Sequence, residues 1–236
     1  MNKINSMIKD LQKQGRDILT EIEAKQIMQA AGIKTVATRL AASQKEAAAV
    51  SAEIGFPVVL KIASPEITHK SDAGGVKTGL KSAADVRQAY RDIMASVRAK
   101  YPKAKIEGVS VQSMARPGIE IIIGMSRDAQ FGPVIMFGLG GIFVEVLKDV
   151  AFRLIPVSRY DAEEMIKEIR GYALLNGYRG QEPAHIPSLV DVLLKVSELV
   201  DKTPEIKEID LNPVFAYKDS AMAVDARIVL EKPEKS

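Results

Sequence analysis

Cysteine and tryptophan are both absent from this chain of 236 residues, and aromatic residues make up only 5% of it. Without cysteine, the chain can form neither a disulfide framework nor a thiolate metal site. The scarcity of aromatic rings argues against a base-stacking platform for single-stranded nucleic acid. The formal net charge is +3, which is too small to indicate nucleic acid or an anionic membrane surface as a partner.

A long apolar segment is also lacking at the start of the chain. Residues 1–17 are polar and contain no apolar run, so we expect neither a signal peptide nor a membrane anchor, and we expect a cytoplasmic protein. Apolar residues at 47% and charged residues at 27% are typical of a globular protein. A chain of this length forms one large domain or two small lobes.

Serine and threonine residues mark the starts of three helices in the first part of the chain, each followed three residues later by an acidic residue. These starting residues are Thr20, Ser43 and Ser82. Short apolar strands are expected between the second and third helices, at residues 57–63 and 76–80. The alternation of helix and strand predicts an α/β lobe over residues 19–105, preceded by an N-terminal extension of residues 1–18.

From residue 106 the pattern changes to short apolar strands joined by turns, which is typical of an antiparallel sheet. The expected strands are residues 106–114, 120–125, 133–137, 143–147, 151–155, 206–211 and 214–217, with a last one around 223–226. Two helices interrupt them, one capped at Asp161 and the other spanning residues 188–201. Residues 106–236 are therefore expected to form a sheet-rich lobe, which makes the fold class α/β (α+β) with two lobes. Clefts between lobes are common sites for small ligands.

Lys61 lies in an otherwise apolar strand segment, after Val58, Val59 and Leu60. A lysine in such a place costs desolvation free energy unless an anionic group meets it. The other interpretation is that Lys61 lies at the edge of the strand and extends its ammonium group to solvent.

The next segment, SPEITHKSDAGGV at residues 64–76, is a candidate phosphate-binding loop. Gly74 and Gly75 can present consecutive backbone N–H groups to phosphate oxygens, although adjacent glycines also form plain turns. The loop is not a P-loop, because the pattern GxxxxGK[ST] does not occur in the chain. His69 is one of two histidines, and it is either a structural loop residue or a group that accepts phosphoryl or carries a proton.

Asp210 and Asn212 lie two residues apart on a predicted strand, so their side chains share one face. Asp225 is expected on the next strand, where it can face them across the sheet. Oxygen ligands of this kind suit Mg²⁺, which takes one or two carboxylates plus nucleotide phosphates. The other interpretation is an Asn-Pro turn with acids that face solvent.

A glycine-rich segment at residues 138–141 also suggests dinucleotide binding. We reject that interpretation because the residues after it read as a strand, whereas the dinucleotide fingerprint requires a helix whose N-terminus receives the pyrophosphate.

The order of these segments resembles the ATP-grasp β subunit of NDP-forming acyl-CoA synthetases. That family includes the ADP-forming acetate–CoA ligases and, more distantly, succinyl-CoA synthetase. The resemblance extends from about residue 19 to residue 229 and implies an ATP-grasp fold with the nucleotide in the cleft between two lobes. It rests on VVLKI, SPEITHKSDAGGV, VQSMARPGIEIIIGMSRDAQFGPVIMFGLGGIFVEVLKDVAFRLIPV and EIDLNPVFAYKDSAMAVDARI.

The resemblance implies how the nucleotide is bound. Lys61 would contact the α- and β-phosphates, and the loop with Gly74 and Gly75, followed by Val76, would close over the phosphates. A hinge would recognise adenine through its backbone, with Glu120 near the ribose. The hinge residues are Gln112, Ser113 and Met114.

The resemblance also implies the chemistry, with ATP or ADP as substrate. Asn212 and Asp225 would bind Mg²⁺. Asp210 would meet a phosphohistidine that arrives from a partner subunit, and His69 would carry the phosphoryl group on this subunit. Glu145 belongs to the same long segment, and no role is assigned to it.

The complete enzyme of this family converts acyl-CoA, phosphate and NDP to a carboxylic acid, CoA and NTP. Because a CoA-binding α subunit supplies half of this chemistry, the resemblance implies an α2β2 heteromer with neither nucleic acid nor membrane as a partner. Two other functions stay open. The first is a stand-alone ATP-grasp ligase, which would form product without a partner. The second is a non-catalytic nucleotide-sensing module, like the degenerate synthetase-like domains attached to some acetyltransferases.

Overall fold

The structure is a computed structural model that describes residues 2–67, 69–141, 148–178, 180 and 182–232. The chain divides into two compact units, and each is described here by itself. Unit 1 comprises Met1–Leu19, Ala24–Thr35 and Pro117–Ser236, and unit 2 comprises Thr20–Glu23 and Val36–Arg116. The predicted strand at residues 143–147, with Glu145, lies outside the described residues. The limits predicted for the extension and the two lobes stay a prediction.

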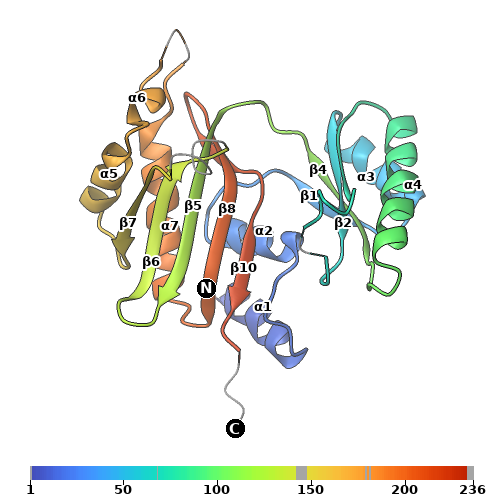
Figure 1. Cartoon of the computed structure of the whole chain (residues 1–236), viewed down its shortest axis with the longest axis horizontal. Coiled ribbons are helices and arrows are strands. Elements are labelled where there is room, and N and C mark those ends of the chain that lie inside the picture. Colours follow the sequence, from blue (N-terminus) through green and yellow to red (C-terminus); the bar gives the residue numbers. More distant parts are fainter. Residues whose placement is uncertain (1, 68, 142–147, 179, 181, 233–236) are drawn as a thin grey trace. The chain divides into compact units, whose positions relative to one another are not determined.

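Unit 2 contains a four-stranded sheet in the order β1-β4-β2-β3, in which all neighbouring strands are antiparallel (Figure 1). The strands are β1 (Thr38–Ala41), β2 (Val58–Ala63), β3 (Val76–Leu80) and β4 (Gly108–Ser113). The helices are α3 (Gln44–Ile54) and α4 (Ala83–Lys100), which contact each other and the sheet. The strands predicted at residues 57–63 and 76–80 are thereby confirmed.

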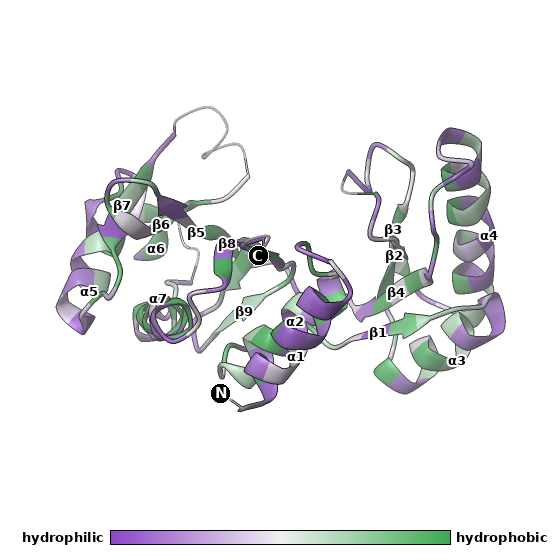
Figure 2. Cartoon of the chain, turned by 90° about the horizontal axis from the view of Figure 1, so that it is seen from below, coloured by the Kyte–Doolittle hydropathy of each residue, from purple (hydrophilic) through white to green (hydrophobic). Residues whose placement is uncertain are grey.

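The helices of unit 2 begin where the capping residues predicted. The hydroxyl of Ser43 accepts the N–H of Glu46, and the hydroxyl of Ser82 accepts the N–H of Asp85. Both helices carry apolar and polar residues, as expected of helices that cover a sheet with one face (Figure 2). The buried residues of α4 join those of β2 and β4 in one core, which includes Leu60, Ile62, Val86, Ile93, Val97, Val109 and Val111.

The placement expected for residues 106–114 is wrong. We expected this strand to begin the second sheet, but β4 pairs with β2 over six residues and with β1 over four. Its apolar residues are buried within the core of unit 2. The succession of strands along the sequence does not determine which of them exchange hydrogen bonds, because pairing is set by long-range packing.

Unit 1 contains a larger antiparallel sheet in the order β10-β8-β5-β6-β7, with β9 paired to β8. The strands are β5 (Ile119–Asp128), β6 (Gly132–Leu139), β7 (Val150–Leu154), β8 (Ile206–Ala216), β9 (Ala221–Ala223) and β10 (Arg227–Leu230). Together the two sheets confirm the mixed α and β class that the sequence predicted.

Among the described residues, five helices belong wholly or largely to unit 1. They are α1 (Asn2–Lys13), α2 (Glu21–Ala30), α5 (Arg159–Glu168), α6 (Tyr172–Leu175) and α7 (Ile186–Asp201). Within the parts of the chain that the structure describes, no helix is long and apolar enough to cross a membrane. Residues Ile4, Ile8 and Leu11 of α1 are buried in the core of unit 1, so the polar start of the chain is an amphipathic helix.

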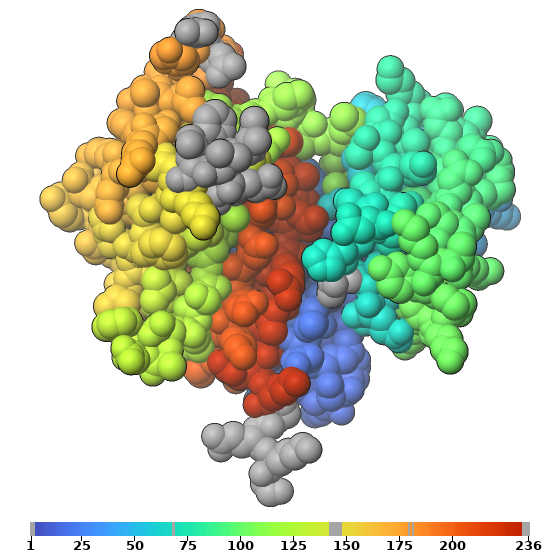
Figure 3. All heavy atoms as spheres, viewed as in Figure 1, coloured from blue at the N-terminus to red at the C-terminus, as the bar shows by residue number. Residues whose placement is uncertain are grey.

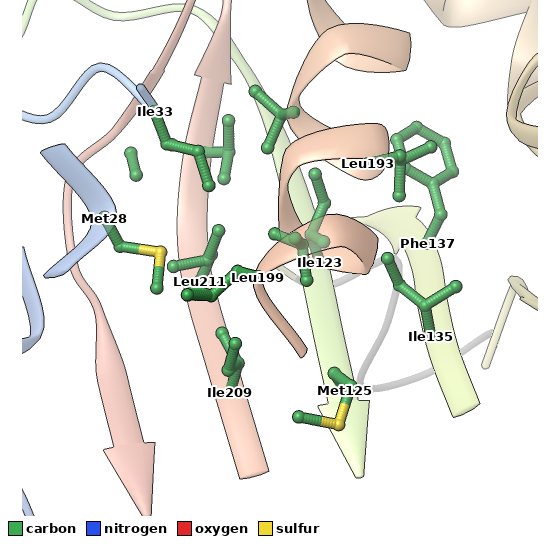
Figure 4. Packing of buried hydrophobic residues seen from close by; sticks show 14 of the residues in the cluster. Met28, Ile33, Ile123, Met125, Ile135, Phe137, Leu193, Leu199, Ile209 and Leu211 are labelled. Carbon is green, nitrogen blue, oxygen red and sulfur yellow. The ribbon is translucent and has the colours of Figure 1, made fainter. Parts of the chain in front are cut away.

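The core of unit 1 lies between α7 and the inner face of the sheet (Figure 4). Buried residues of β8 are separated by exposed or half-buried ones, as expected of a strand with one face on the core, whereas β5 and β6 each contain three consecutive buried residues. The packed residues labelled in the figure include Ile123, Met125, Ile135, Phe137, Leu193, Leu199, Ile209 and Leu211.

Two local predictions in unit 1 need correction. The helix expected to be capped at Asp161 begins earlier, because Ser158 is its N-cap and Asp161 is the third residue of a capping box. The strands expected at residues 206–211 and 214–217 are one continuous strand, β8. Its pairing with β5 shifts register near Asn212 and Pro213, so a bulge takes the place of the expected turn.

Candidate functional site

Lys61 is buried on β2, and an anionic side chain meets it inside unit 2. Its Nζ lies 2.9 Å from Oε1 of Glu21, the first residue of α2. Only 10% of the Lys61 side chain and 4% of the Glu21 side chain are exposed. The interpretation of Lys61 as a solvent-reaching edge lysine is therefore wrong, because β2 lies between β4 and β3 and the charge is paired in the interior.

Glu21 holds a second cation. Its other oxygen, Oε2, lies 2.9 Å from Nζ of Lys70, whose side chain is 23% exposed. Glu21 is fixed at the start of its helix by the capping box in which the N–H of Thr20 donates to Glu23 and the N–H of Glu23 donates to Thr20. One buried carboxylate thus holds two lysines from segments that are 40 and 49 residues away in the sequence.

The loop that carries Gly74 and Gly75 folds onto β2. The N–H of Gly74 donates to the carbonyl of Ser71 (2.9 Å), and the N–H of Gly75 donates to the carbonyl of Lys70 (2.8 Å). A side chain at residue 75 would collide with Ile62, its Cβ lying only 2.6 Å from Cγ2 of Ile62. Since both N–H groups bond within the loop here, their predicted contact with phosphate requires the loop to rearrange and stays a prediction. Val76, which begins β3, lies directly opposite Lys61 in the sheet.

His69 lies near the middle of the same loop, with its side chain exposed to solvent. Its backbone carbonyl accepts the N–H of Ala73 (3.2 Å), which holds the residue in a turn. An exposed imidazole is accessible to a phosphoryl donor, as a carrier residue requires. Its role as phosphoryl carrier remains a prediction.

The hinge predicted to bind adenine lies at the end of β4. Gln112 is buried, Ser113 is half-buried and Met114 is exposed. The N–H of Ser113 donates to the carbonyl of Ala37 (2.9 Å), and the N–H of Met114 donates to the carbonyl of Pro57 (3.1 Å). Because these donors are engaged, adenine recognition by this segment would use its carbonyl groups, and the assignment stays a prediction.

Glu120, expected near the ribose, is exposed on β5 of unit 1. Its carbonyl accepts the N–H of Gly140 (2.7 Å), and a Cβ at residue 141 would lie 3.0 Å from its Oε2. Gly138 lies within β6, where a Cβ would lie 2.8 Å from the carbonyl oxygen of Asp149. The glycines at residues 138–141 thus allow the backbone to pack closely against Glu120 and Asp149. The residues that follow, on which our rejection of the dinucleotide fingerprint depends, lie outside the described residues, so that rejection stays a prediction.

Asp210 and Asn212 lie on the face of β8 opposite the core. The residues between and beside them, Ile209 and Leu211, are buried, whereas Asp210 is half-buried and Asn212 is exposed. This alternation confirms that the two polar side chains share a face. Strands β8 and β10 form part of the visible surface of unit 1 in Figure 3.

Asp225 lies in the connection between β9 and β10, and not on a strand as we expected. The pairing of β8 with β10 and its pairing with β9 follow one register, which sets residue 225 opposite residue 212. Between these two ladders, the N–H of Val224 donates to the carbonyl of Pro213 (2.9 Å). The register continued through this connection thus sets Asp225 opposite Asn212, and their joint role as metal ligands stays a prediction.

The surroundings of Asp210 raise the pKa of its carboxyl group. Burial raises its pKa, and the negative charges of Asp225 and Glu208 add to the rise, while the guanidinium of Arg227 opposes it. Arg227 lies directly opposite Asp210 in the sheet. The ionised form of such a carboxyl group is destabilised, so binding of a proton or of a positively charged group at this position is favoured.

The donors on this face fit Mg²⁺ with a nucleotide. Asn212 offers an amide oxygen and Asp225 a carboxylate, and Mg²⁺ commonly takes so few protein ligands because phosphates and waters complete its shell. The described residues contain no group of three histidine, cysteine or acidic side chains arranged to hold a metal ion. The pair therefore suits a metal that arrives with its nucleotide better than a permanent structural metal.

The sequence alone did not identify three residues that contact or lie opposite the predicted site residues. They are Glu21, Lys70 and Arg227. Glu21 lies within the capping box that begins at Thr20. An acidic residue is common there because it interacts favourably with the helix dipole, so its presence gave no sign of a further role. Lys70 follows His69 within the predicted phosphate loop, so its charge was visible there. Nothing local in the sequence shows that all three face partners on other segments.

The comparisons with known proteins agree over most of the chain. The model of the ATP-grasp domain family matches residues 10–230. The chain is 53% identical over 212 residues to the acetate–CoA ligase [ADP-forming] I subunit beta of Pyrococcus furiosus, covering 90% of this chain and 91% of that protein. It is 47% identical over 204 residues to acetate–CoA ligase [ADP-forming] I of Archaeoglobus fulgidus, covering 86% of this chain but 30% of that longer protein.

Solved structures give the same result. The dinucleotide forming acetyl-coenzyme A synthetase 1 of Ca. Korarchaeum cryptofilum, in complex with coenzyme A, Ca-AMPCP and HgCl+, superposes with a TM-score of 0.94 at 50% identity, covering 96% of this chain and 99% of that one. A complex of the same synthetase with coenzyme A and Mg-AMPPCP has its phosphohistidine segment pointing towards the nucleotide binding site. It superposes with a TM-score of 0.86 at 46% identity, covering 97% and 100% of the two chains.

Proposed function

This chain belongs to the ATP-grasp family, among the β subunits of ADP-forming acetate–CoA ligases, and we propose that it handles the nucleotide in an ADP-forming acyl-CoA synthetase. This membership confirms the fold and the family resemblance expected from the sequence. The reaction is acyl-CoA + phosphate + ADP = carboxylic acid + CoA + ATP. The observation that carries the proposal is that unit 2 holds both a buried lysine, Lys61, paired with Glu21, and an exposed histidine, His69, on the loop between β2 and β3.

The chemical step assigned to this chain is phosphoryl transfer between a phosphohistidine and ADP. The N–P bond breaks and its electron pair returns to the imidazole nitrogen, while a β-phosphate oxygen of ADP forms the new P–O bond. Such a transfer requires positioning and charge stabilisation more than covalent chemistry. Lys61 would contact the α- and β-phosphates, and His69 would carry the phosphoryl group on this subunit.

The remaining site residues would orient the nucleotide. Gln112, Ser113 and Met114 would bind adenine, Glu120 would lie near the ribose, and the loop with Gly74, Gly75 and Val76 would exclude water from the phosphates. Asn212 and Asp225 would hold Mg²⁺, which when bound supplies positive charge to the phosphate oxygens. Asp210 would accept a hydrogen bond from the incoming histidine segment of the partner.

We also propose a CoA-binding partner and a cytoplasmic location. The Pyrococcus furiosus relative is named a subunit, and the Archaeoglobus fulgidus relative is a longer protein of which this chain matches 30%. A partner α subunit would supply the remaining chemistry, in an α2β2 complex whose mass native mass spectrometry can measure. Neither a nucleic acid nor a membrane has a part in the proposal.

The substitution His69→Ala tests the proposal with the partner subunit present. Net acyl-CoA synthesis should fall by about 1,000-fold or more, as on removing a covalent carrier. Binding of Mg-ADP, measured by calorimetry, should be almost unchanged, because the imidazole is not a ligand of the bound nucleotide. The matched control is His185→Ala, which removes the only other histidine.

Two results would contradict the proposal in different ways. Unchanged turnover in His69→Ala would remove this histidine from the mechanism. A wild-type protein that does not bind Mg-ADP would exclude the nucleotide-handling role altogether.

A further inference from the structure

We infer that Lys70 is a second phosphate-binding cation of the nucleotide site, held beside Lys61 by Glu21 as their shared counter-ion. This inference rests on the proposed function, because it adds a residue to the same site. Lys70 follows the proposed carrier histidine directly in the sequence, and the comparison with the family gave it no role.

The geometry places two ammonium groups on the two oxygens of one carboxylate. Lys61 lies 2.9 Å from Oε1 of Glu21, and Lys70 lies 2.9 Å from Oε2. Since both ammonium groups are at hydrogen-bond distance from the same carboxylate, their nitrogens are at most roughly 8 Å apart. A ligand with two adjacent phosphate groups that contacts Lys61 is then within reach of Lys70.

The exposure of the three side chains shows where a ligand can reach the cluster. The Glu21 and Lys61 side chains are 4% and 10% exposed. Charges removed from water are stable only with partners of opposite sign, and their attraction to those partners is strengthened by the low local dielectric. Lys70 is the most exposed member, at 23%, so it is the member that a ligand from solvent reaches first.

The fold of the loop fixes Lys70 in this position. Its carbonyl accepts the N–H of Gly75, and the carbonyl of Gly75 accepts the N–H of Ile62 on β2 (2.7 Å). This close approach requires glycine at residue 75, because a Cβ there would lie 2.6 Å from Ile62 and 3.0 Å from the carbonyl oxygen of Lys70. The glycine therefore seats Lys70 against the strand that carries Lys61.

A purely structural role for Lys70 makes a different prediction. If Lys70 only neutralised Glu21, its removal would lower the free energy of unfolding without changing the affinity for nucleotide. If Lys70 binds phosphate, its removal weakens binding in proportion to the phosphate content of the ligand, since hydrogen bonds to charged groups are the strong ones.

The experiment compares Lys70→Met with the wild-type full chain by calorimetry. The Kd for Mg-ADP should rise about tenfold, as expected for one lost charge-assisted hydrogen bond, while the Kd for adenosine should change less than about twofold. Lys103→Met removes the same charge from an exposed lysine of unit 2 and should leave both values unchanged. Lys70→Arg keeps the cation and should bind Mg-ADP within about threefold of wild type.

The outcomes distinguish a failure of the inference about Lys70 from a failure of the proposed function. Wild-type affinity for Mg-ADP in Lys70→Met overturns the inference about Lys70 and leaves the proposed function intact. Absence of Mg-ADP binding in the wild-type chain overturns the proposed function itself. If Lys70→Met does not fold, Lys70→Gln gives the same answer, because its amide still donates to Glu21 without a charge.

Discussion

Asp210 is a residue of the candidate site whose ionised carboxylate lowers the free energy of unfolding. Its pKa in the folded protein is raised above 3.8, chiefly by burial, so the native state binds this proton more tightly than the unfolded chain does. The free energy of unfolding therefore falls as the pH rises from 3.8 through the raised pKa. Above the raised pKa the loss is complete, and the ionised carboxylate then makes the folded state less stable.

The substitution Asp210→Asn should consequently stabilise the protein at neutral pH while impairing phosphoryl transfer. We expect a gain of less than about 1 kcal/mol, because solvent screens a half-buried charge. Urea unfolding at about pH 7 should show the gain, and at about pH 4 it should be smaller. Asp92→Asn, on the exposed side of α4, serves as the control. A loss of stability in Asp210→Asn at neutral pH would show that Arg227 outweighs burial.

For individual residues, the sequence predicted that Lys61 requires an anionic partner, but it did not identify that partner. The neighbouring residues Val58, Val59 and Leu60 are apolar, so the local sequence alone indicates that the Lys61 ammonium group loses hydration. Its partner Glu21 lies 40 residues earlier in the sequence. Only folding brings two such residues together, so the local sequence pattern could not predict this ion pair.

Among the elements, α5 depends on a complete capping box. The Ser158 hydroxyl accepts the N–H of Asp161 (3.1 Å), and the Asp161 carboxylate accepts the N–H of Ser158 (2.9 Å). Ser158→Ala should lower the free energy of unfolding by about 1 kcal/mol, since it leaves a helix N–H group without its cap. Chemical denaturation measures the change. Ser126→Ala, exposed on β5, should change it by less than about 0.5 kcal/mol, and equal effects would contradict the capping role.

Elements were predictable where the signal is local. The caps at Ser43 and Ser82 lie within three residues of their partners, and the strand at residues 57–63 is continuously apolar. The position of β4 in its sheet was not predictable, because backbone pairing depends on segments far away in the chain. The helix α1 was overlooked because Ile4, Ile8 and Leu11 are separated by polar residues, although their spacing is helical.

At the scale of the whole molecule, the two units have separate hydrophobic cores. The sequence predicted a change from alternating helix and strand to successive strands, and that change reflects the two sheets. The exact membership of each unit was not predictable. Residues 20–23, which include the first three residues of α2, belong to unit 2, whereas the rest of α2 belongs to unit 1. No change in composition marks this boundary.

The dependence on a partner is the prediction that belongs to this scale. The chain matches a protein named a subunit over 91% of its length and a longer single protein over only 30%. The purified chain should therefore bind Mg-ADP but form ATP from acyl-CoA, phosphate and ADP at least about 100-fold more slowly than with its CoA-binding partner, because the reacting groups are not positioned together.

The assay couples ATP formation to a reporter enzyme and titrates the partner into a fixed amount of this chain. Activity should rise with the partner and reach a plateau at one partner per chain, and the His69→Ala chain should form the complex without gaining activity. Turnover by the isolated chain at the rate of the complex would identify a stand-alone ligase instead. Because an ATP-grasp ligase acting alone must bind its acid substrate, such turnover would also move the search for the acyl site onto this chain.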